Sequence, residues 1–476
     1  MTTSKLAKNT LFLTAASIGQ KCIAFAYFAI LANYLGSSGN GAYFLALGMV
    51  TTIGVLDDIG LTSVLTREVA RTPGDATRWL RSILGFKLFT IPFSIIIAFI
   101  LPAVVGYTEQ VQMLVLLALG IMIADTLSLT FYSVLRGMQN LAYESLGIFS
   151  GQLLSTVLGL ILIVTHTATL PTLVLALTLG STFNLCFSAY QVTRRLGLKS
   201  LLPKVSFDTV LLRMAFPFFL AAVFVKIYSY FDSFVLNAIL GQAAVGVYGV
   251  AYKLTYAFQF LPLAFIGALY PTMSAAADKP ADLKKIFLDA EWYVSLLAAP
   301  IVFGIWSLAP EIISYFNHDY ASAAVPLSIL IFVLLPIFLD FPIGSLLNAT
   351  RRQHIKTAIM GSVMVINVMA NLILIPILGI AGACVAALIS FIFMFAAGWY
   401  FAAPIASLKF VELIKSVGGF YLSGLVMALV VFAVKSHVPF VASMIIGGLV
   451  YVVCIFASRA FTVDHLHSFR QILRRR

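Results

Sequence analysis

The sequence has little charge, few cysteines and no long polar segment. Only 10% of its 476 residues are charged, whereas an ordinary soluble domain carries about 25% and needs them to cover its surface. Hydrophobic residues make up 61% of the chain, and the mean hydropathy is +1.03. The apolar residues must therefore face lipid. This composition excludes a soluble enzyme, a nucleic-acid-binding protein and a secreted disulfide scaffold.

The cysteines do not form a recognisable site. There are four, in widely separated apolar runs, with no CxxC motif and no histidine close by: Cys22, Cys186, Cys384 and Cys454. Metal and redox sites need clustered ligands. The sequence therefore predicts no metal, no cofactor and no catalytic cysteine, and these residues are expected to pack or to face lipid.

Long apolar runs fill the rest of the chain. A membrane helix needs about 20 mainly apolar residues, and strand-like alternation is absent, so we predict an all-α membrane protein. Fourteen runs qualify: 9–34, 42–65, 82–105, 111–135, 145–165, 170–193, 214–239, 246–273, 292–309, 322–347, 357–378, 380–403, 416–434 and 439–458.

The basic residues orient these spans. If the N-terminus is cytoplasmic and each run crosses once, most of the 30 basic residues fall in cytoplasmic segments and only Lys435 falls in an outside loop. Such a bias is typical of cytoplasmic loops and accounts for the net charge of +12. It predicts a multi-pass protein of the cytoplasmic (inner) membrane with both termini inside.

An internal repeat divides the chain into two halves. The pattern L-G-x4-G-x-Y begins at Leu35 and again at Leu240, at equivalent places in two six-span units. Parallel repeats of this kind form transporters with the substrate site between the halves. We expect two six-helix lobes related by a pseudo-two-fold axis, residues 1–205 and 206–408. Residues 409–476 add a pair of helices and a basic tail.

Lysines lie inside the predicted spans, where a charge costs at least about 2.5–3.5 kcal/mol and so indicates function. Lys21 and Lys226 are separated by 205 residues, as are the two glycine turns. They are therefore expected to reach a central cavity from opposite halves, and Lys253 adds a third cation. Polar residues on the same helix faces complete the predicted substrate-binding set: Ser17, Gln20 and Tyr230.

The alternative is that these lysines only hold helices together by pairing with buried aspartates: Asp57, Asp58, Asp125, Asp232 or Asp340. Three of these acids, Asp58, Asp125 and Asp232, are candidates for ion coupling. Lys87 lies near the start of its predicted span, so its side chain is expected to snorkel to the surface. Arg351 or Arg352 is the expected partner of Asp340 at the end of another span.

Short motifs give the chain a family resemblance. They run from Leu35 to Tyr43, from Asp58-Ile59-Gly60-Leu61 to Arg67-Glu68, from Phe216-Pro217-Phe218 to Asp232, through Ala251-Tyr252-Lys253-Leu254 and Leu261-Pro262-Leu263, and over Gly379-Ile380-Ala381-Gly382-Ala383. With six, six and two spans, the chain resembles the polysaccharide (O-antigen) flippase branch of the multidrug/oligosaccharidyl-lipid/polysaccharide exporter superfamily. The likeness covers nearly the whole chain.

The resemblance implies alternating access by two rocking lobes. It implies flipping of an undecaprenyl-diphosphate-linked oligosaccharide, such as an O-antigen or exopolysaccharide repeat unit. Lys21 and Lys226 would then meet the diphosphate while the last two spans guide the lipid tail. Its implied partners are membrane lipid and the polysaccharide polymerase and glycosyltransferases of the same pathway.

Two other functions stay open. A drug or cation exporter of the same superfamily would use buried acids, but it usually has twelve spans and no paired lysines. A membrane-embedded glycosyltransferase or ligase would need polar catalytic groups in a sizeable loop. The longest outside loop, around Glu311 to Tyr320, has only the neighbours His318 and Asp319 to offer. We therefore expect no enzyme activity.

Overall fold

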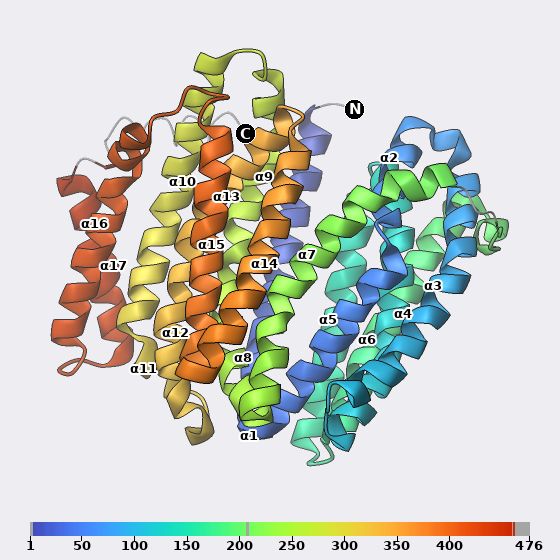
Figure 1. Ribbon diagram of the computed structural model, residues 1–476, viewed down its shortest axis with the longest axis horizontal. Coiled ribbons are helices and arrows are strands. Elements are labelled where there is room, and N and C mark those ends of the chain that lie inside the picture. The colour runs from blue at the N-terminus through green and yellow to red at the C-terminus, as the bar shows by residue number, and fades with distance from the viewer. Residues whose placement is uncertain (1–2, 206–208, 459, 462–476) are drawn as a thin grey trace. The chain divides into compact units, whose positions relative to one another are not determined.

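The computed structural model describes residues 3–205, 209–458 and 460–461, and the side chains of residues 3–18 and 263–268 lie outside that description. Every regular element in the described part of the chain is helical (Figure 1). The predicted all-α class is confirmed. The helices group into two compact units, Met1–Gly249 and Val250–Arg476.

In its described residues, unit 1 holds six long helices and one shorter amphipathic one. They are α1 (Thr3–Asp58), α2 (Leu61–Arg71), α3 (Ala76–Val104), α4 (Glu109–Gly137), α5 (Leu141–Val164), α6 (Leu170–Leu196) and α7 (Thr209–Leu240). The unit ends within α8 (Gln242–Tyr256). Its described core is built from α2, α3 and α4, with Leu211 and Ala215 of α7 packed against them.

The repeated glycine motifs mark sharp breaks in the chain. Gly36 interrupts α1 with φ 66° and ψ 179°, and Gly241 separates α7 from α8 with φ 82°. Side chains disfavour these left-handed conformations, and glycine adopts them freely. Predicted spans 1 and 2 therefore share the single helix α1, bent at Gly36.

Unit 2 follows from the last residues of α8. Its helices are α9 (Phe260–Ala275), α10 (Pro280–Ser307), α11 (Ala309–Ile313), α12 (Ala324–Leu330), α13 (Leu334–Ala349), α14 (Gln353–Leu378), α15 (Ile380–Ala402), α16 (Phe410–Val434) and α17 (Phe440–Ala457). Short 3₁₀ turns join several of them.

The last two helices pack against α10 (Figure 1). The Trp292 indole N–H donates to the Ala460 carbonyl at 3.0 Å, and the Tyr451 hydroxyl donates to the Leu296 carbonyl at 2.9 Å. Ion pairs fasten the two ends of α16, from Lys284 to Glu412 and from Lys435 to Glu311. The appended pair is thus built into unit 2.

Twelve helices in the described residues are long and apolar enough to cross a membrane. The difference from fourteen has two causes: α1 counts once although it contains two predicted spans, and predicted span 8 is divided between α8 and α9. Large apolar side chains are exposed along the helices, as on α3 at Leu88, Phe93 and Phe99. This is the surface expected of a protein whose solvent is lipid.

Candidate functional site

Within unit 1, α7 runs antiparallel to the second half of α1. Three glycines mark the contact: Gly48 of α1 and Gly60 just after it meet α7, and Gly41 of α1 meets the start of α8. A Cβ at Gly41 would collide with the Gln242 carbonyl, and one at Gly60 would lie 2.5 Å from the Ala215 carbonyl oxygen. As the numbers rise along α1 they fall along α7, so the contact line extends over the length of both helices.

Tyr230 and Lys226 lie together on this line. The Tyr230 ring packs on Gly48, where a Cβ would be 3.0 Å from its Cδ1 atom, and its centroid is 6.4 Å from that of Phe44. The Lys226 Nζ lies 5.7 Å from the Tyr230 centroid, within reach of a cation–π interaction. Both side chains are half-buried.

The other predicted binding residues lie apart from this pair. Lys21 is exposed and Gln20 is half-buried on the first half of α1, which packs on α5 through Gly19 and Tyr27. Among the described contacts, none joins them to Lys226 or Tyr230. The Ser17 side chain lies outside the described residues. Lys253 is exposed on α8 and belongs to unit 2.

The alternative is that the intramembrane lysines pair with aspartates to hold helices together. The part of the chain that the structure describes shows such a pair for Lys87 but not for Lys21 or Lys226. Among the described residues, no carboxylate lies within ion-pair distance of Lys21 or Lys226. The Lys87 Nζ, in contrast, is 3.8 Å from the Asp58 carboxylate. The predicted surface position of Lys87 is wrong, since its side chain is only 1% exposed.

The reason for the error on Lys87 is the start of its helix. Hydropathy placed the beginning of the span at residue 82, but α3 begins at Ala76, so Lys87 lies about three turns inside. There its ammonium donates to the Asp57 carbonyl at 3.0 Å and to Thr126 Oγ1 at 2.9 Å. Buried polar hydrogen-bond partners replace the surface that snorkelling would have reached.

The three candidate ion-coupling acids have different surroundings. Asp58 accepts hydrogen bonds from the Thr62 amide at 3.2 Å and hydroxyl at 2.9 Å in addition to its ion pair. Asp232, 3% exposed, accepts from the Tyr248 hydroxyl and from the backbone and side chain of Ser233. Asp125 is exposed on α4, beside Ser181. Ion coupling through any of them stays a prediction.

Unit 2 contains two neighbouring acidic residues, Asp340 and Glu291, and the sequence analysis overlooked the second. Asp340 pairs with Lys356, not with Arg351 or Arg352 as predicted, because Lys356 lies one turn into α14 and faces α13. Glu291 of α10 is fully buried near Asp340, and neither of its carboxylate oxygens has a hydrogen-bond partner among the described residues. The sequence did contain a signal for Glu291: it lies about three turns into α10, beyond the charged residues at the start of that helix.

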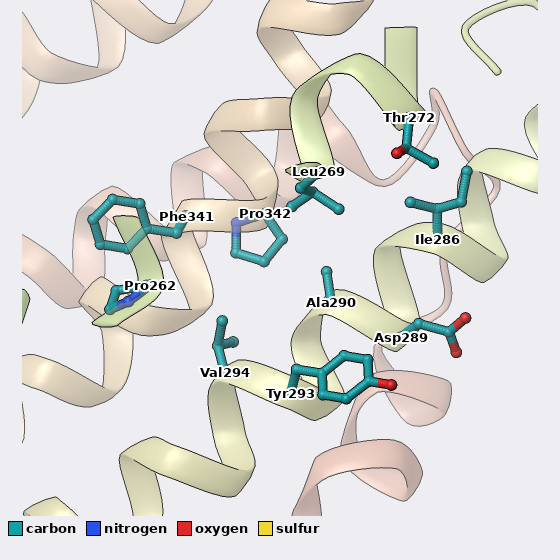
Figure 2. A pocket seen from close by; sticks show the side chains of 10 residues that line it. All are labelled: Pro262, Leu269, Thr272, Ile286, Asp289, Ala290, Tyr293, Val294, Phe341 and Pro342. Atoms are coloured by element: carbon teal, nitrogen blue, oxygen red, sulfur yellow. The ribbon is translucent and has the colours of Figure 1, made fainter. Parts of the chain in front are cut away.

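A cavity of about 300 Å³ opens in the same unit between α9, α10 and α13 (Figure 2). Its walls are mostly apolar, with Leu269, Val294 and Pro342 around the space and Asp289 at one side. None of the predicted binding residues lines it.

The helices are long and apolar enough to cross a bilayer, and one of them carries Lys226 near its middle. These features define a multi-pass membrane protein. Residues 6–277 match the family of polysaccharide biosynthesis proteins, and residues 217–373 match the MatE family. The first match covers more than half of the chain. The chain therefore belongs to the polysaccharide biosynthesis protein family, in the polysaccharide-flippase branch of the exporter superfamily that its motifs resemble.

Individual relatives agree with this family. A probable low-salt glycan biosynthesis flippase of Haloferax volcanii is 26% identical over 91% of this chain and 90% of its own length. A solved structure of the lipid II flippase MurJ has a TM-score of 0.75 at 16% identity, covering 94% of this chain and 99% of that one. An inward-facing multidrug resistance MATE transporter has a TM-score of 0.68 at 16% identity, covering 84% and 96%. The fold is thus that of a superfamily of flippases and transporters.

Proposed function

We propose that the protein flips a polyprenyl-diphosphate-linked oligosaccharide, of the undecaprenyl type, across the cytoplasmic membrane for surface polysaccharide assembly. The observation that carries this proposal is Lys226, a half-buried ammonium in the middle of α7 with no ion-pair partner among the described residues. An unpaired cation at membrane depth is costly unless it meets an anion. A diphosphate supplies that anion.

The surroundings of Lys226 support a headgroup with sugars. The Tyr230 ring next to it offers an apolar face with a hydroxyl beside Thr51, and such amphipathic groups suit an oligosaccharide. The exposed apolar flanks of α3 and α5 would leave the polyprenyl tail in lipid. In this proposal Lys21 and Lys253 contribute further positive charge, and the repeat halves 1–205 and 206–408 rock around the substrate, with both termini cytoplasmic.

Complementation tests the proposal. A strain lacking its own repeat-unit flippase is given the native chain and scored for surface polysaccharide, which is expected to return. Lys226→Met keeps the length of the side chain without its charge and is expected to fail, while Lys285→Met, at an exposed position of α10, serves as the control. Surface polysaccharide at the native level with Lys21→Ala and Lys226→Ala combined would refute the cationic site.

A multidrug or cation exporter is the second candidate, supported by the match of residues 217–373 to the MatE family. That activity requires binding of a cation. The positive charge of Lys226 would repel a cation, whereas the carboxylate of Asp125 or Asp289 would attract one. Ethidium efflux from the same cells separates the two functions. Efflux without restored polysaccharide would favour the exporter.

A further inference from the structure

Asp57, the last residue but one of α1, has an unusual environment. Its side chain is fully buried, and neither carboxylate oxygen accepts a hydrogen bond within the part of the chain that the structure describes. Ser94 of α3 lies beside it, and the Ser94 Oγ is also buried without a hydrogen-bond partner. The Ser94 hydroxyl can donate one hydrogen bond to Asp57, but an ionised carboxylate has two acceptor oxygens, and burying it with a single donor is costly.

The nearby cation faces two carboxylates, Asp57 and Asp58, and a single ammonium cannot neutralise both. The Lys87 ammonium is directed at the Asp57 backbone carbonyl, at Thr126 and at the Asp58 carboxylate. Asp58, whose side chain is 26% exposed, is therefore the ionised partner of Lys87. One ammonium and one carboxylate already balance, so a second carboxylate would be a buried, uncompensated charge.

The other charged groups around this corner are also occupied. Arg136 of α4 interacts with Asp58, but its guanidinium is bound by Glu144 of α5, with Nε 2.7 Å from Oε2. On α2, Arg67 pairs with Glu68 at 3.0 Å. No charged group of α7 contacts the corner among the described interactions. Among the described residues, no arginine lies within ion-pair distance of Asp57.

The corner itself depends on the same hydrogen bonds. Between α1 and α2 the chain turns through Ile59, with φ 44°, and Gly60, with φ 76°. A β-branched residue in this region costs roughly 1–2 kcal/mol and needs support from its neighbours. Lys87 and Thr90 give that support by donating to the Asp57 carbonyl, at 3.0 Å and 3.1 Å. Gly60 in turn packs on α7 at Ala215 and Phe219.

We propose that Asp57 is a proton-binding site: it carries a proton in this conformation and donates it in a hydrogen bond to Ser94 Oγ. Release of the proton would create a second carboxylate beside Lys87. The ammonium would then be drawn from the Asp57 carbonyl and Asp58, and the corner that seats α7 would loosen. The site goes beyond the proposed flippase activity, because it would bind protons whatever the substrate is.

Infrared spectroscopy on the full chain in lipid nanodiscs tests this site directly. A protonated carboxyl has a carbonyl stretch separate from the bands of an ionised carboxylate. The native protein should show this stretch at mildly acidic pH, above the pKa of about 3.9 of an ordinary aspartate. Asp57→Asn, an isosteric neutral replacement, should remove one component of it, whereas Glu412→Gln, which removes a partly exposed carboxylate paired with Lys284, should leave that component in place.

Two further variants secure the assignment. Glu291→Gln should remove a different component if that buried acid is protonated as well, and must not remove the one lost with Asp57→Asn. Ser94→Ala takes away the proposed acceptor and should shift the Asp57 component to higher frequency, which keeps the test open if Asp57→Asn does not fold. The proposal is overturned if Asp57→Asn removes ionised-carboxylate bands instead, or if Ser94→Ala leaves the protonated band unmoved. Complementation by any variant reports separately on the flippase proposal.

Discussion

Lys87 and Lys226 show how one residue type takes two roles according to its neighbours. The Lys87 ammonium donates to the Asp57 carbonyl and to Thr126 and pairs with Asp58, so its charge is compensated within unit 1. Lys226 has only the face of the Tyr230 ring beside it among the described contacts. A sequence reports both as intramembrane lysines. Their different hydrogen-bond partners make the first a support for the fold and the second a candidate for binding.

We expect Lys87→Ala to lower the free energy of unfolding by about 3–5 kcal/mol, because it removes a buried donor from the Asp57 carbonyl and Thr126 and leaves the half-buried Asp58 without its cation. Thermal unfolding in detergent, followed by size-exclusion chromatography, measures the loss. The matched control is Lys284→Ala, whose ion pair with Glu412 is about one third exposed and is worth about 0–1 kcal/mol. Equal losses in the two variants would contradict the role given to Lys87.

Lys226→Met is expected to reduce flipping by about ten- to a hundredfold without reducing thermal stability. A hydrogen bond to a charged group is worth about 1.5–3 kcal/mol, and in the described structure this ammonium stabilises no carboxylate. Transport of a labelled lipid-linked oligosaccharide in proteoliposomes measures the rate. Lys226→Arg, which retains the charge, should recover part of it. A variant that is unstable but transports normally per folded molecule would disprove this expectation.

At the scale of elements, small residues determine how closely α1 and α7–α8 approach. Gly41 and Gly246 contact each other's helices reciprocally: a Cβ on Gly246 would collide with the Ser37 carbonyl, as one on Gly41 would with that of Gln242. The Asn40 side-chain amide also donates to the Gly246 carbonyl at 3.4 Å. The two copies of the sequence repeat therefore touch in space, and their glycines have a packing role besides the turn.

Gly41→Ala should destabilise the protein by about 1–3 kcal/mol, the usual cost of overfilling a packed contact. Gly448→Ala in α17 is the control, since no atom lies within 4 Å of its added methyl group, and alanine is the better helix former by up to about 1 kcal/mol. Thermal melts of the two variants in detergent give the comparison. If both behave alike, the close approach of these helices is not the reason for glycine at position 41.

At the scale of the whole molecule, the helices fit a bilayer and the basic residues suggest its orientation. The loop between α2 and α3 contains exposed Gly74, and the loop between α16 and α17 contains exposed Ser436. The loop with Gly74 is one of the arginine-rich segments predicted to be cytoplasmic. The loop with Ser436 is one of the predicted outside loops, in which Lys435 is the lone basic residue. The two positions are therefore expected to lie on opposite sides of the membrane.

In a background with the four native cysteines replaced, Ser436→Cys should react with a membrane-impermeant maleimide in intact cells. Gly74→Cys should react only after the membrane is permeabilised. Lysine and arginine are retained on the cytoplasmic side during insertion, which is the physical basis of the expectation. Labelling of Gly74→Cys in intact cells would reverse the proposed topology.

The sequence alone determined the solvent, the helical class and the family. Long runs of apolar residues can satisfy their backbone groups in lipid only as helices, and local turn glycines at 36 and 241 are visible without any structure. These properties depend on composition and on neighbours along the chain, so no tertiary contact is needed to predict them. The intramembrane lysines were found for the same reason.

Only the tertiary structure decided which of those charges are satisfied. Hydropathy cannot locate the start of α3 within two turns, so it placed Lys87 at the surface. Hydropathy also cannot identify the environments of Asp57 and Glu291, because a carboxylate oxygen lacks a hydrogen-bond partner only by virtue of its neighbours in space. The partners of Asp58 and Asp340 come from α3 and α14, and packing between helices, not order along the chain, brings them together.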